Sequence, residues 1–530
     1  MKQLYFGGTI LTMEEPPTAE ALLVEDGRIL AAGSRAELET MAPDAEQRNL
    51  GGHTLMPAFI DGHSHITALA QTMGLVQLTG ADSLAEIERR VHAFKKEHHV
   101  ADGAWIIGFG YDQNYLKEGR HPTAADLDGI APHNPLMVGH ASGHMGAANT
   151  AALRKLGVSA DTPDPEGGRI GRLEGSREPD GYLEETAFTT LGYQVPQDAS
   201  AALDNLLRAE QVYLSHGIAT IHDGLTKAPE WKLLKAAAEQ RRFSADIIAY
   251  IDLRDNAAIL PENPDYKNYV NRLKIGGYKL FLDGSPQGRT AWVTAPYEGN
   301  ALPGEGPDYC GYPIYEDAQV LEFLRKALRE RVQIAVHCNG DAAAAQLLSC
   351  YETAYRETGN DVRPLMIHAQ LLRPNQLPAL RRLHMVASFF VAHTYYWGDV
   401  HLKNFGAARA ERISPAKSAL DAGVVFDFHQ DTPVIPPDML ETVWCAVNRT
   451  TREGVTLGEQ ERLTPLEALK AVTINAAYAC FEEGEKGSLL PGKRADLVIL
   501  DGNPLACPPD CIRDIRVLET LKDGATVYKA

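Results

Sequence analysis

Long apolar runs are missing from this 530-residue sequence, which never approaches the ~18 consecutive apolar residues of a membrane-spanning helix. Its opening residues contain neither a continuous apolar core nor a small-residue cleavage site, so they do not predict a secretory signal peptide. Cysteine is scarce as well, with seven residues that lie mostly far apart. This pattern favours reduced thiols over a disulfide framework. We therefore expect a cytoplasmic protein without a membrane partner.

Positive charge is in deficit, because 51 Lys and Arg residues stand against 70 Asp and Glu residues. The net charge of −19 predicts a surface that repels phosphate backbones and anionic membranes, which argues against a nucleic-acid partner. The hydrophobic share of 44% and the charged share of 23% are typical of an ordinary globular protein. A small-molecule substrate is the expected partner, and a homodimer is the default assembly.

Both ends of the chain predict β structure. Apolar runs flank Asp26-Gly27 near the start and Asp523-Gly524 near the end, and such a pair between apolar runs is a strong hairpin signal. We therefore predict one small β-sandwich domain that is built from residues 1–56 and 486–530.

Short apolar runs alternate with helical patterns between these ends, as is typical of βαβ units. Eight candidate strands occur there: Phe59–Asp61, Ile218–Asp223, Asp246–Ile251, Tyr278–Leu282, Gln333–His337, Leu365–His368, Met385–Phe389 and Val424–Phe428. This count predicts a (β/α)₈ barrel over residues 57–485. The segment between the first two strands far exceeds an ordinary loop of ~2–6 residues, so we expect residues 80–205 to form an insertion that covers the active site. Its first predicted helix begins after Ser83.

Metal-binding side chains stand where several of these strands end. The first strand runs into His63 and His65, which point the same way in an extended chain. The fifth and sixth strands end at His337 and His368, and the eighth leads to Asp431. The carboxyl ends of parallel barrel strands converge on one face, so these side chains would meet there as a divalent metal site, most readily for zinc. Each residue alone would more often be structural, and their joint position carries the prediction.

Lys279 lies within the otherwise apolar fourth strand. A buried charge is unfavourable unless it is paired, so this lysine needs a partner on the same face of the barrel.

Further motifs extend through the whole chain. They are Pro57–His65, Lys279–Ser285, Asp431–Val434, Gly119–Thr123, Gly143-His144, Ala151–Leu153 and Lys486–Leu497. With the metal-binding pattern, they make the sequence similar to the amidohydrolase superfamily, in the subgroup that resembles N-substituted formamide deformylases. The resemblance covers essentially the whole chain.

This resemblance implies a role for each metal-binding residue. One ion would be held by His63, His65 and Asp431, and a second by His337 and His368. Lys279 would be carboxylated by CO₂, and the resulting anionic carbamate explains how a lysine can face two cations. One departure is Gln430 before Asp431, where relatives more often have a small residue such as Ser; it bears on the substrate more than on metal binding.

The implied activity is metal-dependent hydrolysis of the C–N bond of a small, largely apolar amide or formamide. Metal-activated hydroxide would be the nucleophile, and Asp431 would be the proton shuttle. The same centre could instead hydrolyse an ester, lactone or carbamate, or catalyse an isomerisation, because the pocket selects the substrate. A non-catalytic binding protein is disfavoured, since none of the six ligand positions is lost.

Further candidates lie in the insertion and in the loops that follow barrel strands, which face the active site of such barrels. Aromatic residues in these places are often part of a core instead. The predicted set is His144 as a second catalytic residue, with Tyr111, Glu185, Arg289, Trp292, Tyr395 and Trp397 as substrate-binding residues.

Overall fold

The computed structural model describes residues 2–113, 115–140, 145–165, 168–188, 199–299 and 306–530. The chain forms two compact units: the first joins Met1–Ala68 to Ala209–Ala530, and the second is Leu69–Arg208. Among the described residues, every helix is too short or too polar to cross a membrane.

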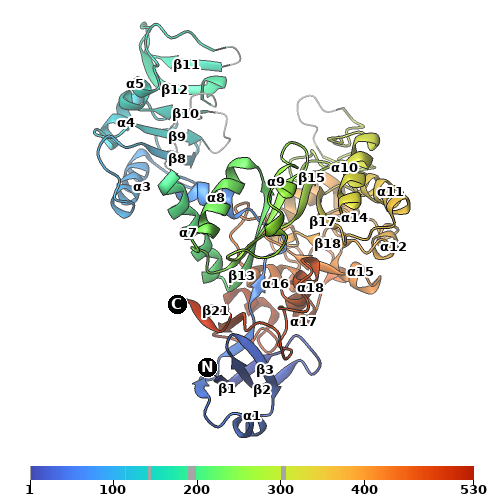
Figure 1. Cartoon of the computed structure of the whole chain (residues 1–530). Coiled ribbons are helices and arrows are strands. Elements are labelled where there is room, and N and C mark those ends of the chain that lie inside the picture. Colours follow the sequence, from blue (N-terminus) through green and yellow to red (C-terminus); the bar gives the residue numbers. More distant parts are fainter. Residues whose placement is uncertain (1, 114, 141–144, 166–167, 189–198, 300–305) are drawn as a thin grey trace. The chain divides into compact units, whose positions relative to one another are not determined.

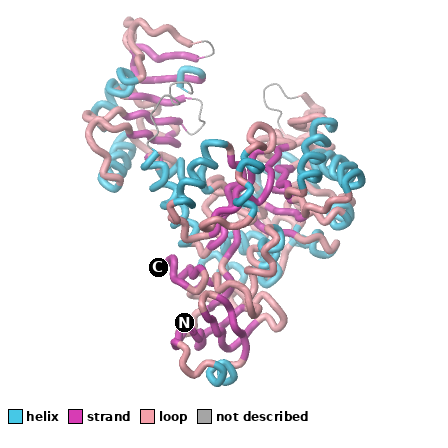
Figure 2. The backbone as a smooth tube through the Cα atoms, in the orientation of Figure 1, coloured by secondary structure: helices cyan, strands magenta, loops and turns pink. Residues whose placement is uncertain are grey.

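The first unit contains a sheet that both ends of the chain build together (Figure 2). Its strand order is β22-β21-β20-β5-β1-β2-β3, and β4 pairs with β1. The two halves of the sheet join where β20 pairs antiparallel with β5. The strands are β1 (Lys2–Leu11), β2 (Thr18–Glu25), β3 (Arg28–Gly33), β4 (Glu46–Asn49), β5 (Thr54–Pro57), β20 (Leu497–Leu500), β21 (Val517–Lys522) and β22 (Ala525–Lys529). Both predicted hairpins are present, with Asp26 and Gly27 in the left-handed conformation that such tight turns require.

Eight parallel strands of the first unit form the barrel, and they pair in the order in which they occur along the chain (Figure 1). They are β6 (Phe59–Ile60), β13 (Ile218–Thr226), β14 (Asp246–Asp252), β15 (Leu273–Phe281), β16 (Gln333–Cys338), β17 (Leu365–His368), β18 (Val386–Phe389) and β19 (Phe426–Phe428). The Gly62 N–H donates to the Phe428 carbonyl at 3.3 Å and so links the end of β6 to the end of β19. The predicted barrel is confirmed, although β15 begins at Leu273, earlier than expected.

Helices cover the barrel between and after its strands. In α10 (Asp317–Glu330), the buried residues Val320, Leu324 and Leu328 recur at helical spacing, as the sequence predicts. The others are α7 (Ala199–Ser215), α8 (Ala228–Glu239), α9 (Ile259–Glu262), α11 (Asp341–Thr358), α12 (Leu377–Arg382), α13 (His393–Tyr396), α14 (Gly398–Ala410), α15 (Ala416–Asp421), α16 (Met439–Asn448), α17 (Pro465–Ala471) and α18 (Ile474–Ala479). The short helix α1 (Arg35–Met41) follows β3, and α2 (Ile66–Met73) follows β6.

The second unit has a six-stranded sheet of its own, in the order β11-β12-β10-β9-β8-β7. Ser83 caps its first helix, because its Oγ accepts the Glu86 N–H, and Ile87 and Val91 bury the apolar face of that helix. The elements are α3 (Leu84–Glu97), α4 (Ala124–Ile130), α5 (Thr150–Lys155), β7 (Val76–Gln77), β8 (Ile106–Tyr111), β9 (Leu136–His140), β10 (Met145–Ala148), β11 (Gly168–Arg172) and β12 (Pro179–Glu185). That the insertion covers the active site stays a prediction.

Candidate metal centre

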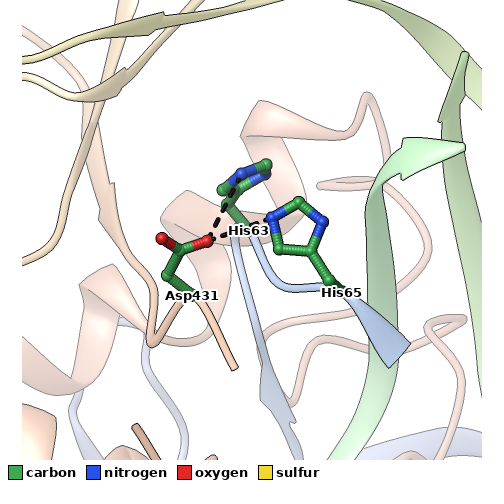
Figure 3. A group of neighbouring side chains, drawn as sticks. All are labelled: His63, His65 and Asp431. Atoms are coloured by element: carbon green, nitrogen blue, oxygen red, sulfur yellow. Dashed lines mark ion pairs between the residues drawn. The ribbon is translucent and has the colours of Figure 1, made fainter. Parts of the chain in front are cut away.

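Three side chains that could hold a metal ion meet at the carboxyl end of the barrel (Figure 3). The Nε2 atoms of His63 and His65 lie 3.8 and 3.1 Å from the same oxygen, Oδ1 of Asp431. All three candidate ligand atoms lie within 4.8 Å of one another. Two imidazoles and one carboxylate at this spacing are a donor set for a divalent cation.

Backbone contacts hold these three residues together. The loops after β6 and β19 are joined by two hydrogen bonds, from Asp431 N–H to the His63 carbonyl (3.1 Å) and from His65 N–H to the Thr432 carbonyl (2.8 Å). Gly224 lies under the His63 ring, and a Cβ at that position would come within 2.1 Å of the imidazole. The ring can take this position only because residue 224 has no side chain.

Lys279 points into the same centre from β15. Its Nζ lies 3.1 Å from Nε2 of His63, and the side chain is buried. Within the described ranges, no carboxylate approaches this amine closely enough to form an ion pair. Burial lowers the pKa of Lys279 from 10.5 to about 7, although the charge of Asp431 opposes the shift. A substantial fraction of this amine is therefore neutral at physiological pH.

His337 and His368 form a second pair beside the first group. Nε2 of His368 lies 3.0 Å from Nδ1 of His337, and their ring centroids are 4.5 Å apart. Burial and the nearby charge of Lys279 lower the pKa of His337 to about 4, and burial together with His337 places the pKa of His368 well below its usual value. Both rings are therefore neutral at physiological pH and have lone pairs available to a metal.

The Asp431 carboxyl supplies the negative charge of the centre. Burial acts to raise its pKa, but the hydrogen bond from His65 and the neighbouring imidazoles hold the pKa well below the usual range. Imidazole nitrogens around an ionised carboxylate fit a divalent metal ion. His368 and Asp431 also have left-handed backbones, with φ of 73° and 54°. Such strain costs about 1–3 kcal/mol per residue and is typical of functional sites.

The loop after β15 contains two of the predicted substrate-binding residues. The Arg289 guanidinium is buried, donates to the Glu298 carbonyl at 2.8 Å and lies 4.9 Å from the ring centroid of Tyr297. It is therefore held by the protein's own groups. Trp292 is half-buried, and its backbone N–H donates to Asp283 at 3.0 Å. A role for either residue in substrate binding stays a prediction.

The two predicted aromatic residues after β18, Trp397 and Tyr395, contact different side chains. Trp397 is half-buried, with its ring centroid 4.5 Å from that of His393 and 5.9 Å from that of Phe390. The ring of Tyr395 instead meets Trp444 edge-on at 5.3 Å. Trp397 is thus linked to the candidate metal centre through Phe390, because the Phe390 ring also contacts His368.

The candidates in the insertion belong to the second unit. Tyr111 is fully buried in its core, and the phenol lies 2.9 Å from Nδ1 of His121. Glu185 is exposed at the end of β12 and has a left-handed backbone. His144 lies outside the described residues. The functional roles of all three stay predictions.

Several buried polar residues of this region had no role in the sequence analysis. His393 and His401 stack at 5.3 Å, with Nδ1 of the first 3.0 Å from Nε2 of the second. Asp283 accepts backbone N–H groups from Trp292, Asn339 and Gly340 and so fixes the two loops beside His337. The rule that points to His337, a polar residue after a barrel strand, also applies to Asp283 and His393.

The fold and the site together define a metal-dependent hydrolase with an eight-stranded parallel barrel. A similar solved structure is an uncharacterized metal-dependent hydrolase from Pyrococcus furiosus, with 25% identity and a TM-score of 0.76 over 95% of this chain and 100% of that chain. The sequence profile of the Amidohydrolase family matches residues 46–528, and the chain belongs to this family. The predicted family is therefore confirmed.

Two curated relatives match along almost the whole chain. N-substituted formamide deformylase from Arthrobacter pascens is 29% identical over 96% of this chain and 95% of its own length. A putative amidohydrolase from Bacillus subtilis (strain 168) is 28% identical over the full length of both chains. A short profile, the imidazolonepropionase-like composite domain of bacteria, matches residues 21–45 in the terminal β domain.

Proposed function

We propose that this protein hydrolyses the C–N bond of a small, largely apolar amide of the N-substituted formamide type. The observation that carries the proposal is the geometry of Asp431, whose Oδ1 lies 3.1 Å from Nε2 of His65 and 3.8 Å from Nε2 of His63. Similarity to an N-substituted formamide deformylase along nearly the whole chain supports the bond type.

In this proposal His63, His65 and Asp431 hold one divalent ion, and His337 and His368 hold a second. The neutral amine of Lys279 would react with CO₂ and lose a proton, and the resulting carbamate anion would supply negative charge to the two ions. Divalent ions at such positions lower the pKa of water and polarise a carbonyl oxygen. The donor set suits zinc, among other ions.

Asp431 would act as the proton carrier. Its carboxylate accepts a proton from the attacking water and donates it to the leaving nitrogen. This second transfer matters most for an amide, because an amine leaves poorly until it is protonated. The aromatic rings of Phe390 and Trp397 would provide apolar contacts for the substituent on the nitrogen.

A matched pair of substrates tests the bond type. N-benzylformamide and benzyl formate share the acyl group and the apolar substituent, and they differ in the leaving atom. We expect the larger kcat/KM for the amide, relative to the uncatalysed hydrolysis of each compound. Preference for the ester, with no measurable turnover of formamides of several sizes, would contradict the proposal and favour the ester or lactone alternative.

Elemental analysis tests the metal content independently of the substrate. Protein purified with bicarbonate and without chelator should contain about two equivalents of zinc or a similar ion. About one equivalent would contradict the carbamate-bridged pair, and metal-free protein after attempted reconstitution would contradict the hydrolytic mechanism.

A further inference from the structure

His429 is a buried histidine for which neither the metal-binding pattern nor the proposed reaction has a use. It follows the last residue of β19 and precedes Asp431 by two positions. Its ring centroid lies 5.0 Å from that of His368, 5.3 Å from that of Phe390 and 5.5 Å from that of His63, and the residue is fully buried. A polar ring at this depth needs partners for both nitrogens.

Both ring nitrogens of His429 have such partners. Nε2 lies 3.1 Å from Nδ1 of His368, and Nδ1 lies 2.9 Å from Oγ of Ser388. The remaining nitrogen of His368, Nε2, is the one that lies 3.0 Å from His337. His429 therefore contacts the ring nitrogen of His368 that does not face His337.

Asp427 lies at the far end of this row of contacts. Ser388 and Asp427 are directly opposite each other in the register of β18 and β19. Both carboxylate oxygens of Asp427 are buried, and neither meets hydrogen-bond geometry with a donor in the part of the chain that the structure describes. The Ser388 hydroxyl is the neighbouring donor that lowers the pKa of Asp427, and it can rotate its proton toward the carboxylate. Gly62 packs on the carboxylate, since a Cβ there would lie 2.7 Å from Oδ1.

These contacts form a row from Asp427 through Ser388 and His429 to His368. The hydrogen-bonding capacity of each group determines which atom donates in each contact. An ionised carboxylate only accepts, so Ser388 donates its proton to Asp427 and its oxygen accepts the Nδ1–H of His429. The neutral ring of His429 then has its lone pair on Nε2, where it accepts the Nδ1–H of His368. The lone pair of His368 is left on Nε2, on the side of His337.

We propose that His429, supported by Ser388 and Asp427, is a positioning residue that fixes the tautomer of His368, so that Nε2 of His368 can bind the second metal ion. This inference rests on the two-ion centre of the proposed function. In the opposite tautomer Nε2 would hold a proton and could not bind a metal. Partners of this kind around a metal-binding histidine typically change metal affinity by about 10–100-fold.

Titration of the metal-free full-length protein with Co²⁺ alone tests the proposal, with binding followed by visible absorption and by calorimetry. Measurements at pH 8 lie above the pKa of about 7 to which burial raises Asp427. The variants are His429→Leu, which removes the acceptor, and His429→Gln, whose side-chain oxygen can accept in place of Nε2. His222→Leu is the matched control, because His222 is an equally buried barrel histidine that contacts Cys480.

We expect His429→Leu to weaken the second Co²⁺ equivalent by about 10–100-fold and to leave the first unchanged. His429→Gln should restore most of this affinity, and His222→Leu should leave both equivalents unchanged. If His429→Leu does not fold, Ser388→Ala serves in its place, with a smaller loss confined to the second equivalent.

Three results would overturn the proposal. The first is equal weakening of both equivalents, or no weakening, in His429→Leu or its replacement Ser388→Ala. The second is a folded His429→Gln that binds no better than His429→Leu, which would indicate a direct metal ligand instead. The third is wild-type protein that saturates with one equivalent, which contradicts the two-ion centre itself and is thereby distinct from a failure of His429 alone.

Discussion

Two clusters of buried charge lie at opposite ends of the barrel strands, and they differ in how well their charges are paired. Asp246, at the start of β14, accepts the amines of Lys486 and Lys522 at 2.6 Å each. Lys522 also contacts Asp496 at 2.6 Å, and Lys486 contacts Glu482 at 2.8 Å. At the other end, the Lys279 amine has a neutral imidazole as its hydrogen-bond partner.

The difference appears in the pKa values. In the first cluster, burial acts to lower the pKa of Lys486, but Asp246 and Glu482 raise it above the usual value; burial acts to raise the pKa of Glu482, but Lys486 and Lys274 lower it to about 2. In the metal centre, burial lowers the pKa of Lys279 to about 7. Buried charges that pair with each other stabilise the contact between the barrel and β21 of the terminal sheet. Buried groups that lack such pairs remain available to bind a cation and to take part in a reaction.

Asp431→Asn in the metal centre should have the largest effect on function. We expect kcat to fall by about 10²–10⁴-fold, because the amide cannot carry a proton from water to the leaving nitrogen. Steady-state hydrolysis of N-benzylformamide measures the loss, with metal content and circular dichroism as controls for binding and folding. Near-normal turnover in a folded, metal-loaded variant would exclude Asp431 as the proton carrier.

Asp246→Asn makes the same substitution in the paired cluster, and we expect it to act on stability instead. The change removes the carboxylate that Lys486 and Lys522 share, and loss of one partner from a buried ion-pair cluster typically costs about 3–5 kcal/mol. Urea unfolding of the metal-free protein measures the loss of free energy. The kcat/KM of the folded protein should stay within about twofold, since the substitution is distant from the substrate. A loss of activity without a loss of stability would contradict the inference that the paired cluster serves stability and the metal centre serves function.

Lys279→Met should stabilise the metal-free protein, because it removes a buried amine that pairs poorly. The pKa of Lys279 is lower in the folded chain than in the unfolded chain, so the unfolded state binds more protons between pH 7 and 10.5. The native lysine therefore destabilises the folded protein most below about pH 7, and this destabilisation declines as the pH rises toward 10.5.

We expect the free energy of unfolding of this variant to exceed that of the wild type by about 1–4 kcal/mol at pH 6. The difference should disappear toward pH 10. Urea unfolding at both pH values measures the trend. The same variant should also lose bound metal, so an equal metal content in both proteins would show that Lys279 has no part in the centre.

Asp421→Asn should have the smallest effect, because its partner Lys417 and the aspartate itself are solvent-exposed on α15. Exposed ion pairs one helical turn apart contribute about 0.3–0.5 kcal/mol. Thermal unfolding in low and high salt measures the change, which should disappear in high salt. A loss comparable to that of Asp246→Asn would indicate that burial does not explain the difference between the two clusters.

Much of the barrel and of the metal centre can be predicted from the sequence because both repeat a simple pattern. A parallel barrel buries each strand, which gives short apolar runs, and its ligands stand where those runs end. The motif from His63 to His65, the strand ends at His337 and His368, and Asp431 all follow this rule. The structure brings these four histidines and the aspartate to one face together with Lys279.

The parts that the sequence does not predict depend on contacts between distant segments. Arg289 has a left-handed backbone with φ of 58°, and its guanidinium is held by the Glu298 carbonyl, which no local pattern reveals. Tyr111 ends an apolar strand, so its ring packs in the core of the second unit. The row from His429 to Ser388 joins two strands through side chains, and its direction depends on a carboxylate on a third position, Asp427.

Closure of the barrel between Gly62 and Phe428 also has a consequence for the protein during its synthesis. Two of the candidate ligands, His63 and His65, leave the ribosome early, whereas Asp431 follows after most of the chain has been made. At a translation rate of about 5–20 residues per second, Asp431 is synthesised on the order of tens of seconds after the two histidines. The terminal sheet is completed even later, because β5 pairs with β20. The three candidate ligands can therefore come together only after Asp431 has been translated.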